Sequence, residues 1–209
     1  MRKIASIIVF VFLISIPITV FAQGDNTIEL IVPWAQKNDS ILKVSIINKA
    51  NLSEDKILII KKVIESDNNY VENGQTFFEG WIGALKSIPS STVKKFDITV
   101  SEELDNGDIV IQLLTEKHPV YAGFTVPQYV GNHMVKSDIK IYDSQNISSA
   151  QLENLVRHEL GHALGLGHSD LHEDIMYPTM GATPKFISGC AIIGLQSLFE
   201  GHSLRDVNC

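Results

Sequence analysis

The most informative part of this 209-residue chain is Arg157-His-Glu-Leu-Gly-His-Ala-Leu-Gly-Leu-Gly-His168. His158 and His162 are four residues apart, so on a helix both imidazoles leave the same face, one turn apart. Two imidazoles placed in this way can share one zinc ion. Gly165 permits a positive φ, with which the chain can turn sharply out of the helix and bring His168 back to the same ion. The stretch therefore predicts a metal centre with three histidine ligands.

Glu159 and the open fourth position of such a metal carry the predicted chemistry. Three protein nitrogens leave one position for water, which is typical of a catalytic zinc site and not of a closed structural one. Glu159 follows the first ligand directly and can lie beside the metal without binding it. From there it can act as general base on the attacking water and then pass the proton to a leaving amine. Three unrelated surface or core histidines are the weaker interpretation, because packing does not explain the spacing.

The residues around this stretch predict the helix that carries it and a second helix near the C-terminus. Ser148 or Ser149 can cap the first helix, and Gln151 stands three residues after Ser148, as in a capping box. The last helix is expected from Ser188 to about Glu200, where the following glycine ends it.

Upstream of residue 148 the sequence predicts five strands and two helices. Strands are expected at 40–47, 96–100, 108–114, 121–126 and 138–142, where β-branched and aromatic residues gather. Helices are expected from Ser53 to about Glu65 and over 76–88, where apolar residues recur at roughly helical spacing, with a polar turn at 66–74 between them. Strands alternating with helices, followed by a strand-rich stretch, fit an α+β fold with a twisted, mixed, five-stranded sheet that carries helices on one face.

Composition and the N-terminal segment restrict the class of protein. The net charge of −7 repels phosphate backbones, so we expect no nucleic-acid partner. Residues 1–22 join Arg2 and Lys3 to a long apolar run and are expected to be a cleaved signal peptide, which leaves one domain at residues 23–209. An uncleaved membrane anchor is the alternative, although Pro17 interrupts the run. We expect a secreted monomer without membrane contact after cleavage, in which residues 23 to about 39 are a short propeptide or an N-terminal arm.

Two cysteines, Cys190 and Cys209, bracket the last predicted helix. In an oxidising compartment such a pair most simply forms one disulfide, which would tie the chain end to the body of the protein. Two free thiols or an intermolecular bridge are the alternatives.

The stretch from His158 to His168 matches the metzincin zinc signature, and Asp174-Ile-Met-Tyr-Pro178 resembles the Met-turn that follows it in that clan. Ser169, directly after the third histidine, and the run Ile193–Phe199 make the chain most similar to the matrixins. The resemblance implies a zincin-like catalytic domain and a secreted zinc metalloendopeptidase that acts on extended proteins or peptides. It also implies that Met176 lies beneath the metal as an apolar floor.

The same resemblance implies an edge strand around residues 121–125 that pairs with the substrate. The expected substrate contacts are Ala122, Gly123, Phe124, Pro178 and Met180. Plain sheet structure is the alternative for the strand residues.

Further metal sites are less definite. Calcium is usual in the family, and oxygens could come from Asp105, Asn106 and Asp108, or from Asp170 and Glu173, although these residues could equally be solvated turns. The second zinc site of vertebrate matrixins is not recognisable, and His118 and His133 are expected at the surface.

Two other classes of function remain open. One is a secreted zinc-binding or adhesion module that has lost catalysis, against which the intact Glu159 argues, because a pure zinc binder needs no general base. The other is an exported inhibitor-like or structural protein that binds no zinc. Protein hydrolysis that a chelator blocks would exclude the module that has lost catalysis. The zinc content of the purified protein tests the inhibitor-like or structural class, which binds no zinc.

Overall fold

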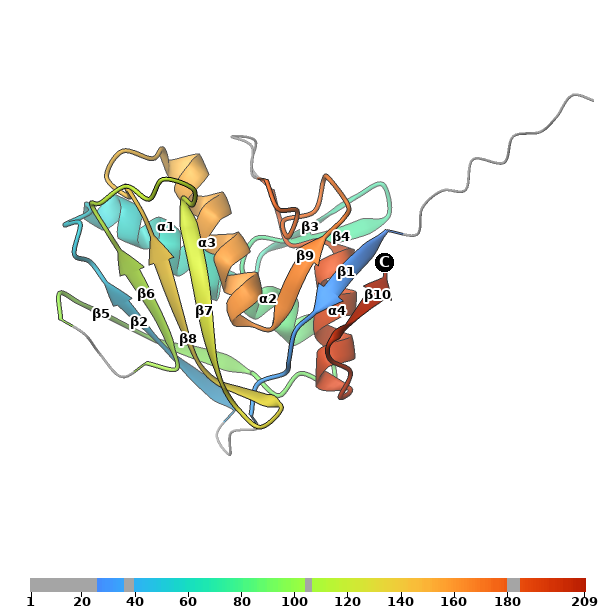
Figure 1. Ribbon diagram of the computed structural model, residues 1–209. Coiled ribbons are helices and arrows are strands. Elements are labelled where there is room, and N and C mark those ends of the chain that lie inside the picture. Colours follow the sequence, from blue (N-terminus) through green and yellow to red (C-terminus); the bar gives the residue numbers. More distant parts are fainter. Residues whose placement is uncertain (1–25, 36–39, 104–106, 180–184) are drawn as a thin grey trace, which may run out of the picture.

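A computed structural model describes residues 26–35, 40–103, 107–179 and 185–209 (Figure 1). The expected signal peptide at 1–22 lies outside these ranges, as do Met180, Asp105 and Asn106. Within the described ranges, every helix is too short or too polar to cross a lipid bilayer.

Five strands form the main sheet, in the order β5-β2-β6-β8-β7. These strands are β5 (Lys95–Ser101), β2 (Ile41–Ile47), β6 (Ile109–Leu113), β8 (His133–Ile141) and β7 (Gly123–Val130). The first four run parallel to one another, and β7 is antiparallel to β8, its single neighbour. The predicted mixed five-stranded sheet is confirmed, with β7 at an edge; β7 and β8 are longer than the segments expected for them.

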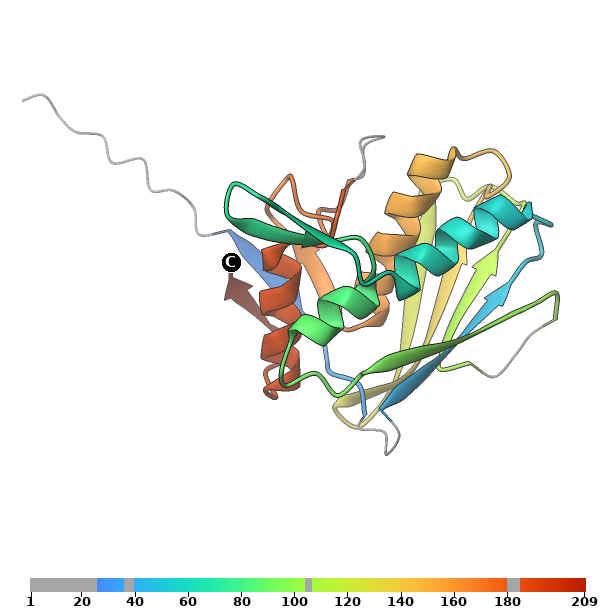
Figure 2. The ribbon, with the colours of Figure 1, turned by 180° about the vertical axis from the view of Figure 1, so that it is seen from behind.

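Two helices, α1 (Glu54–Glu65) and α3 (Ser149–Ala163), pack against each other on one face of this sheet (Figure 2). The apolar stripe of α1 is buried there and consists of Ile57, Ile60, Val63 and Ile64. Each such side chain contributes roughly 1.5–3 kcal/mol through burial. Ser148 caps α3 in a capping box with Gln151, as the sequence predicts. This packing fixes α3, which carries two of the candidate ligands, against the sheet.

Residues 66–88 differ from the sequence prediction of a polar turn followed by a helix from residue 76. The chain forms a hairpin of β3 (Asn69–Glu72) and β4 (Gln75–Phe78), and only then the short helix α2 (Trp81–Ser87). Asn73 and Gly74 at the hairpin tip both have positive φ, 51° and 79°, which two-residue hairpin turns require. Phe78 exchanges two backbone hydrogen bonds of 3.0 Å with Ile187. These bonds stabilise strand geometry where side-chain spacing alone suggests a helix.

A second sheet of three short strands is absent from the sequence prediction. Its central strand β1 (Thr27–Leu30) lies antiparallel to both β10 (Arg205–Asn208) and β9 (Leu166–Ser169). The last helix, α4 (Gly189–Phe199), packs against β1 and lies where the sequence predicts it. The disulfide between Cys190 and Cys209, with Cα atoms 4.8 Å apart, joins α4 to the chain end and confirms that prediction.

Candidate metal centre and cleft

Three histidines converge at the C-terminal end of α3. His158 and His162 lie on the helix with their Nε2 atoms 3.1 Å apart, and His168 returns to them from β9. The three side chains each offer a nitrogen, and these nitrogens all lie within 4.8 Å of one another. Across the described ranges, no other set of three or more His, Cys, Asp or Glu side chains is placed to hold a metal ion. The structure therefore brings together the three ligands that the sequence predicts.

Gly165 makes the turn that returns the chain to the metal centre. Its φ is +103°, and its N–H donates to the His162 carbonyl at 3.0 Å. A Cβ atom at this position would overlap the carbonyl oxygen of Val32. The turn thus requires glycine for its conformation and for the close approach of the N-terminal segment.

Backbone carbonyls orient the first two imidazoles. His158 Nδ1 lies 2.7 Å from the Ile175 carbonyl oxygen, and His162 Nδ1 lies 2.9 Å from that of Leu166. A carbonyl only accepts hydrogen bonds, so each Nδ1 carries the proton and each Nε2 keeps its lone pair for a metal. Burial lowers the pKa of His158 to about 4 and that of His162 to about 3, so both rings are neutral near pH 7. Neutral imidazoles around one open position fit zinc.

Glu159 lies beside this triad and contacts the edge strand β7. The Thr125 hydroxyl donates to Glu159 Oε2 at 2.6 Å, and a Cβ atom at Gly123 would lie only 2.6 Å from Oε1. Burial raises the pKa of the Glu159 carboxyl to about 7, against the lowering effect of the Thr125 hydroxyl. Thr125 belongs to the edge strand expected at 121–125, but its contact with Glu159 was not predicted, although alternation along a strand places Thr125 on the same face as Gly123.

Met176 is fully buried and lies against Gly161 of α3. Its N–H donates to Asp174 Oδ1 at 2.7 Å, and its carbonyl accepts from the Ser169 N–H at 3.0 Å. A Cβ atom at Gly161 would overlap the Met176 sulfur. Because Gly161 lies between the two helical ligands in sequence, its small size allows the sulfur to approach the helix at the metal centre.

The triad and Glu159 open into a cavity of about 600 Å³. Four of the expected substrate contacts line it, namely Ala122, Gly123, Phe124 and Pro178, whereas Met180 lies outside the described residues. The lining also includes Tyr121 and Thr125 of the expected edge strand, and four residues that were not predicted at the cleft, namely Ile31, Val120, Pro127 and Leu155. Nothing in the sequence places Ile31 of the N-terminal segment at the cleft.

Comparison with known proteins agrees with this arrangement of three histidines, a glutamate and a methionine-containing turn. The family model described as Matrixin, Peptidase M10, matches residues 75–200. The chain belongs to the matrixin family. It is 30% identical over 128 residues to Metalloendoproteinase 2-MMP of Arabidopsis thaliana, over 52% of this chain and 34% of that protein. It is 39% identical over 61 residues to Metalloendoproteinase 4-MMP of the same plant, over 28% of this chain and 18% of that protein. The matched regions thus span about a third of the first relative and less than a fifth of the second.

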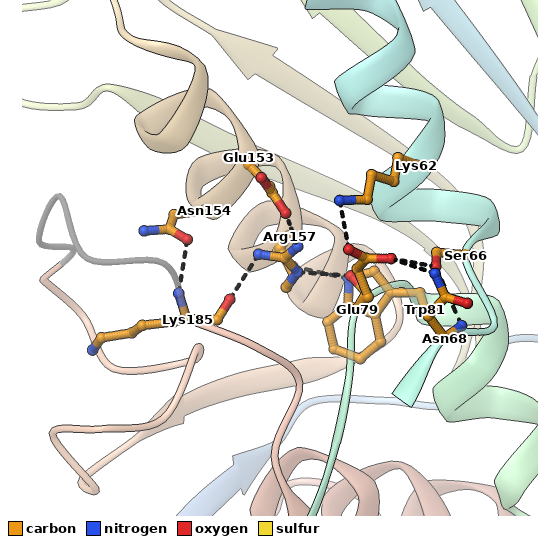
Figure 3. A network of polar contacts seen from close by, with 9 residues as sticks. All are labelled: Lys62, Ser66, Asn68, Glu79, Trp81, Glu153, Asn154, Arg157 and Lys185. Atoms are coloured by element: carbon orange, nitrogen blue, oxygen red, sulfur yellow. Dashed lines mark hydrogen bonds and ion pairs between the residues drawn. The ribbon is translucent and has the colours of Figure 1, made fainter. Parts of the chain in front are cut away.

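A buried arginine ties the active-site helix of this matrixin to the segments around it (Figure 3). Arg157 is fully buried, and its guanidinium donates to the Glu79 carbonyl at 3.0 Å, to the Lys185 carbonyl at 2.7 Å and to Glu153 Oε1 at 2.6 Å. Arg157 directly precedes His158. These bonds therefore fix the first ligand relative to the β3–β4 hairpin and to Lys185, shortly before α4.

The carboxylate of Glu79 extends this network to α1 (Figure 3). It lies 2.5 Å from Lys62 Nζ and accepts hydrogen bonds from Ser66 Oγ at 2.7 Å and Asn68 Nδ2 at 3.0 Å. Burial raises the pKa of Glu79, but these three partners outweigh it and lower the pKa to about 2. The carboxylate is therefore charged near pH 7 and holds the end of α1 beside the hairpin.

The candidate calcium oxygens of this matrixin that lie in the described ranges bind separate protein partners. Asp170 accepts from the N–H and hydroxyl of Thr27 at 2.6 and 3.1 Å, and Asp108 accepts from the Lys43 N–H at 2.8 Å. Glu173 Oε1 lies 3.3 Å from His172 Nδ1. Within the described residues none of these carboxylates belongs to a group of three His, Cys, Asp or Glu side chains that could hold a metal ion, and the calcium expected from the resemblance stays a prediction.

His118 and His133 do not meet in this matrixin. His133 begins β8 and is exposed, whereas the ring of His118 packs on Tyr142, just beyond the other end of that strand. His118 Nδ1 accepts from the N–H groups of Val120 and Tyr121 at 3.3 and 3.0 Å. Its ring therefore orders the loop that leads into the cleft.

Proposed function

We propose that this matrixin is a secreted zinc-dependent endopeptidase that hydrolyses peptide bonds in extended polypeptides. The observation that carries the proposal is that Glu159 and three convergent histidines open into one cavity beside a sheet edge. A binding module has no need of a buried carboxylate beside its metal ligands. Membership of the matrixin family supports the same activity.

In this proposal different residues bind the metal, accept the proton and position the general base. His158, His162 and His168 hold the ion, and bound zinc lowers the pKa of a water molecule and polarises a carbonyl oxygen. Glu159 is the general base: its carboxylate accepts a proton from the attacking water and donates it to the leaving amine. The Thr125 hydroxyl holds that carboxylate in place through the 2.6 Å hydrogen bond.

The edge strand β7 positions the substrate in this proposal. Its outer side has no neighbouring strand in the described sheet, so an extended peptide can add to it through backbone hydrogen bonds. Ala122, Gly123 and Phe124 contact the peptide from this strand and the residue before it, and Pro178 contacts it from the segment after Met176. Met176 forms the apolar floor beneath the ion, and the contact expected from Met180 stays a prediction.

The cellular setting follows from the disulfide. A bond between Cys190 and Cys209 indicates a protein of the secretory pathway, because disulfides persist in oxidising compartments. Cleavage after residue 22, release of residues 23–209 as one domain, and a monomeric state are further parts of the proposal.

Glu159→Gln tests the function. We expect the wild-type protein to bind one zinc ion and to cleave denatured proteins and a quenched peptide library, with activity lost to a chelator and restored by zinc. Glu159→Gln should keep the zinc and lose kcat/KM by about 10²–10⁴-fold, the usual contribution of general acid–base catalysis. Glu65→Gln, an exposed position at the end of α1, is the matched control and should retain full activity.

Two results would contradict the proposal at different points. Full activity in Glu159→Gln would remove Glu159 from its role as base. A wild-type protein that binds zinc yet cleaves nothing in the peptide library would be a silent zinc-binding module.

A further inference from the structure

Lys56, in the first turn of α1, places its ammonium among three carbonyl oxygens of one loop. Its Nζ lies 3.2 Å from the oxygen of Ser144, 2.9 Å from that of Gln145 and 3.0 Å from that of Ile147. A lysine ammonium has three N–H donors and no acceptor, so these contacts use its full capacity. Four consecutive residues thus bend around one positive charge.

This loop leads directly into the helix of the metal centre. It connects β8 to α3, and Ile147 is followed by Ser148, the N-cap of α3. Asp143 begins the loop with a φ of +50° and accepts from Asn146 through both its carbonyl, at 2.9 Å, and its side chain, at 2.6 Å. The ammonium therefore holds the segment that sets where α3 begins.

The arrangement has the chemistry of a cation site. Three carbonyl dipoles point their negative ends at one position, where they repel one another unless a positive charge lies between them. Backbone carbonyl oxygens are also ligands that calcium uses in loops. Asp143, the carboxylate of this loop, instead lies 3.4 Å from Lys117 Nζ and binds Asn146. The calcium that the family implies does not fit this loop, because the ammonium fills the position among the carbonyls.

We propose that Lys56 is a built-in cation that takes the place of a metal ion in the loop 143–147. The start of the zinc-binding helix is thereby fixed by a side chain, and this part of the fold is independent of calcium. The proposal concerns α1 and one loop, and it stands whether or not the protein is a protease.

Two substitutions and a matched control test the proposal in the zinc-loaded protein. Lys56→Met removes the charge but keeps the apolar stem, and we expect the melting temperature to fall by about 3–6 °C, as for a loss of one to two hydrogen bonds in a protein of this size. Lys61→Met makes the same change on the same helix, away from the three carbonyls, and should shift melting by less than about 1 °C. Lys56→Asp adds a carboxylate to the three carbonyls. It should be destabilised without calcium and recover its melting temperature in millimolar calcium, whereas the wild type should not respond in this way.

Equal melting temperatures for Lys56→Met and Lys61→Met would overturn the proposal. So would an equal calcium response of the wild type and Lys56→Asp. If the Lys56 variants fail to fold, NMR of the wild-type protein with ¹⁵N-labelled lysine decides. The ammonium protons of Lys56 should exchange with water much more slowly than those of Lys61, and equally fast exchange would overturn the proposal.

Discussion

Replacing Arg157 by methionine tests whether the buried guanidinium fixes the helix of the metal centre. Methionine keeps a flexible, unbranched apolar stem that fills most of the space, so loss of packing contributes little. The three donors disappear. Their acceptors, which are the Glu79 and Lys185 carbonyls and the Glu153 carboxylate, lose their partner.

The expected magnitude follows from the environment of those acceptors. Hydrogen bonds to a charged group contribute roughly 1.5–3 kcal/mol each, but removal of the buried guanidinium also removes a desolvation cost of several kcal/mol. The Glu153 side chain is 21% exposed and can turn to water, whereas the two partly buried carbonyls each cost about 1–3 kcal/mol if unpaired. We expect a loss of about 3 kcal/mol, at the lower end of the range for breaking a buried ion pair.

Thermal denaturation of the zinc-loaded protein measures this loss. One kcal/mol shifts the melting temperature by roughly 2–4 °C at this chain length, so Arg157→Met should melt about 6–12 °C lower. Arg157→Lys keeps the charge, but one ammonium cannot span acceptors on three separate segments, so its loss should be intermediate. A fall of less than about 2 °C in Arg157→Met would contradict this expectation, since the network would then contribute no net stability.

Three further substitutions test separate contacts. Thr125→Val keeps the side-chain shape but removes the hydroxyl that holds Glu159. We expect kcat/KM to fall about tenfold, which corresponds to about 1.4 kcal/mol, with the zinc content unchanged. An unaltered kcat/KM would leave that hydrogen bond without a catalytic role. Gly161→Ala forces a Cβ atom against the Met176 sulfur and should cost about 1–3 kcal/mol in urea unfolding, which an unchanged midpoint would contradict. Cys209→Ser opens a loop of 19 residues and should lower the free energy of unfolding by about 3 kcal/mol; reduction of the wild type should give the same loss.

The features that the sequence predicts best depend on local chemistry. The spacing of His158 and His162 follows from the helical turn, and the cap at Ser148 is a contact within four residues. The helix that starts after Ser53, with its acidic first turn, and the strands rich in β-branched residues likewise follow from residues close together in the sequence. The error at residues 66–80 has a local cause, because the aromatic spacing from residue 76 fits a helix, while the Asn73–Gly74 pair at the hairpin tip is the stronger signal.

The features that the sequence does not predict depend on contacts between distant segments. β1, β9 and β10 each have only four residues, too few for a periodic pattern to show, and β1 pairs with a strand at the other end of the chain. The same holds for Arg157, whose burial is explicable only through acceptors on the β3–β4 hairpin and at Lys185. A charged residue beside a metal ligand gives no local sign that its partners lie so far along the sequence.

The position of the third ligand depends both on contacts within a short stretch of sequence and on contacts between distant segments. His168 lies on β9, whose neighbour in the described sheet is β1, and β1 is held in turn by the two hydrogen bonds from Thr27 to Asp170. Ile31, just after β1, donates its N–H to the Gly165 carbonyl at 2.8 Å and lines the cleft. Residues 27–31 thus support the turn and the strand that carry the third ligand. The motif determines which atoms bind the metal, whereas the N-terminal strand determines where the last of those atoms lies.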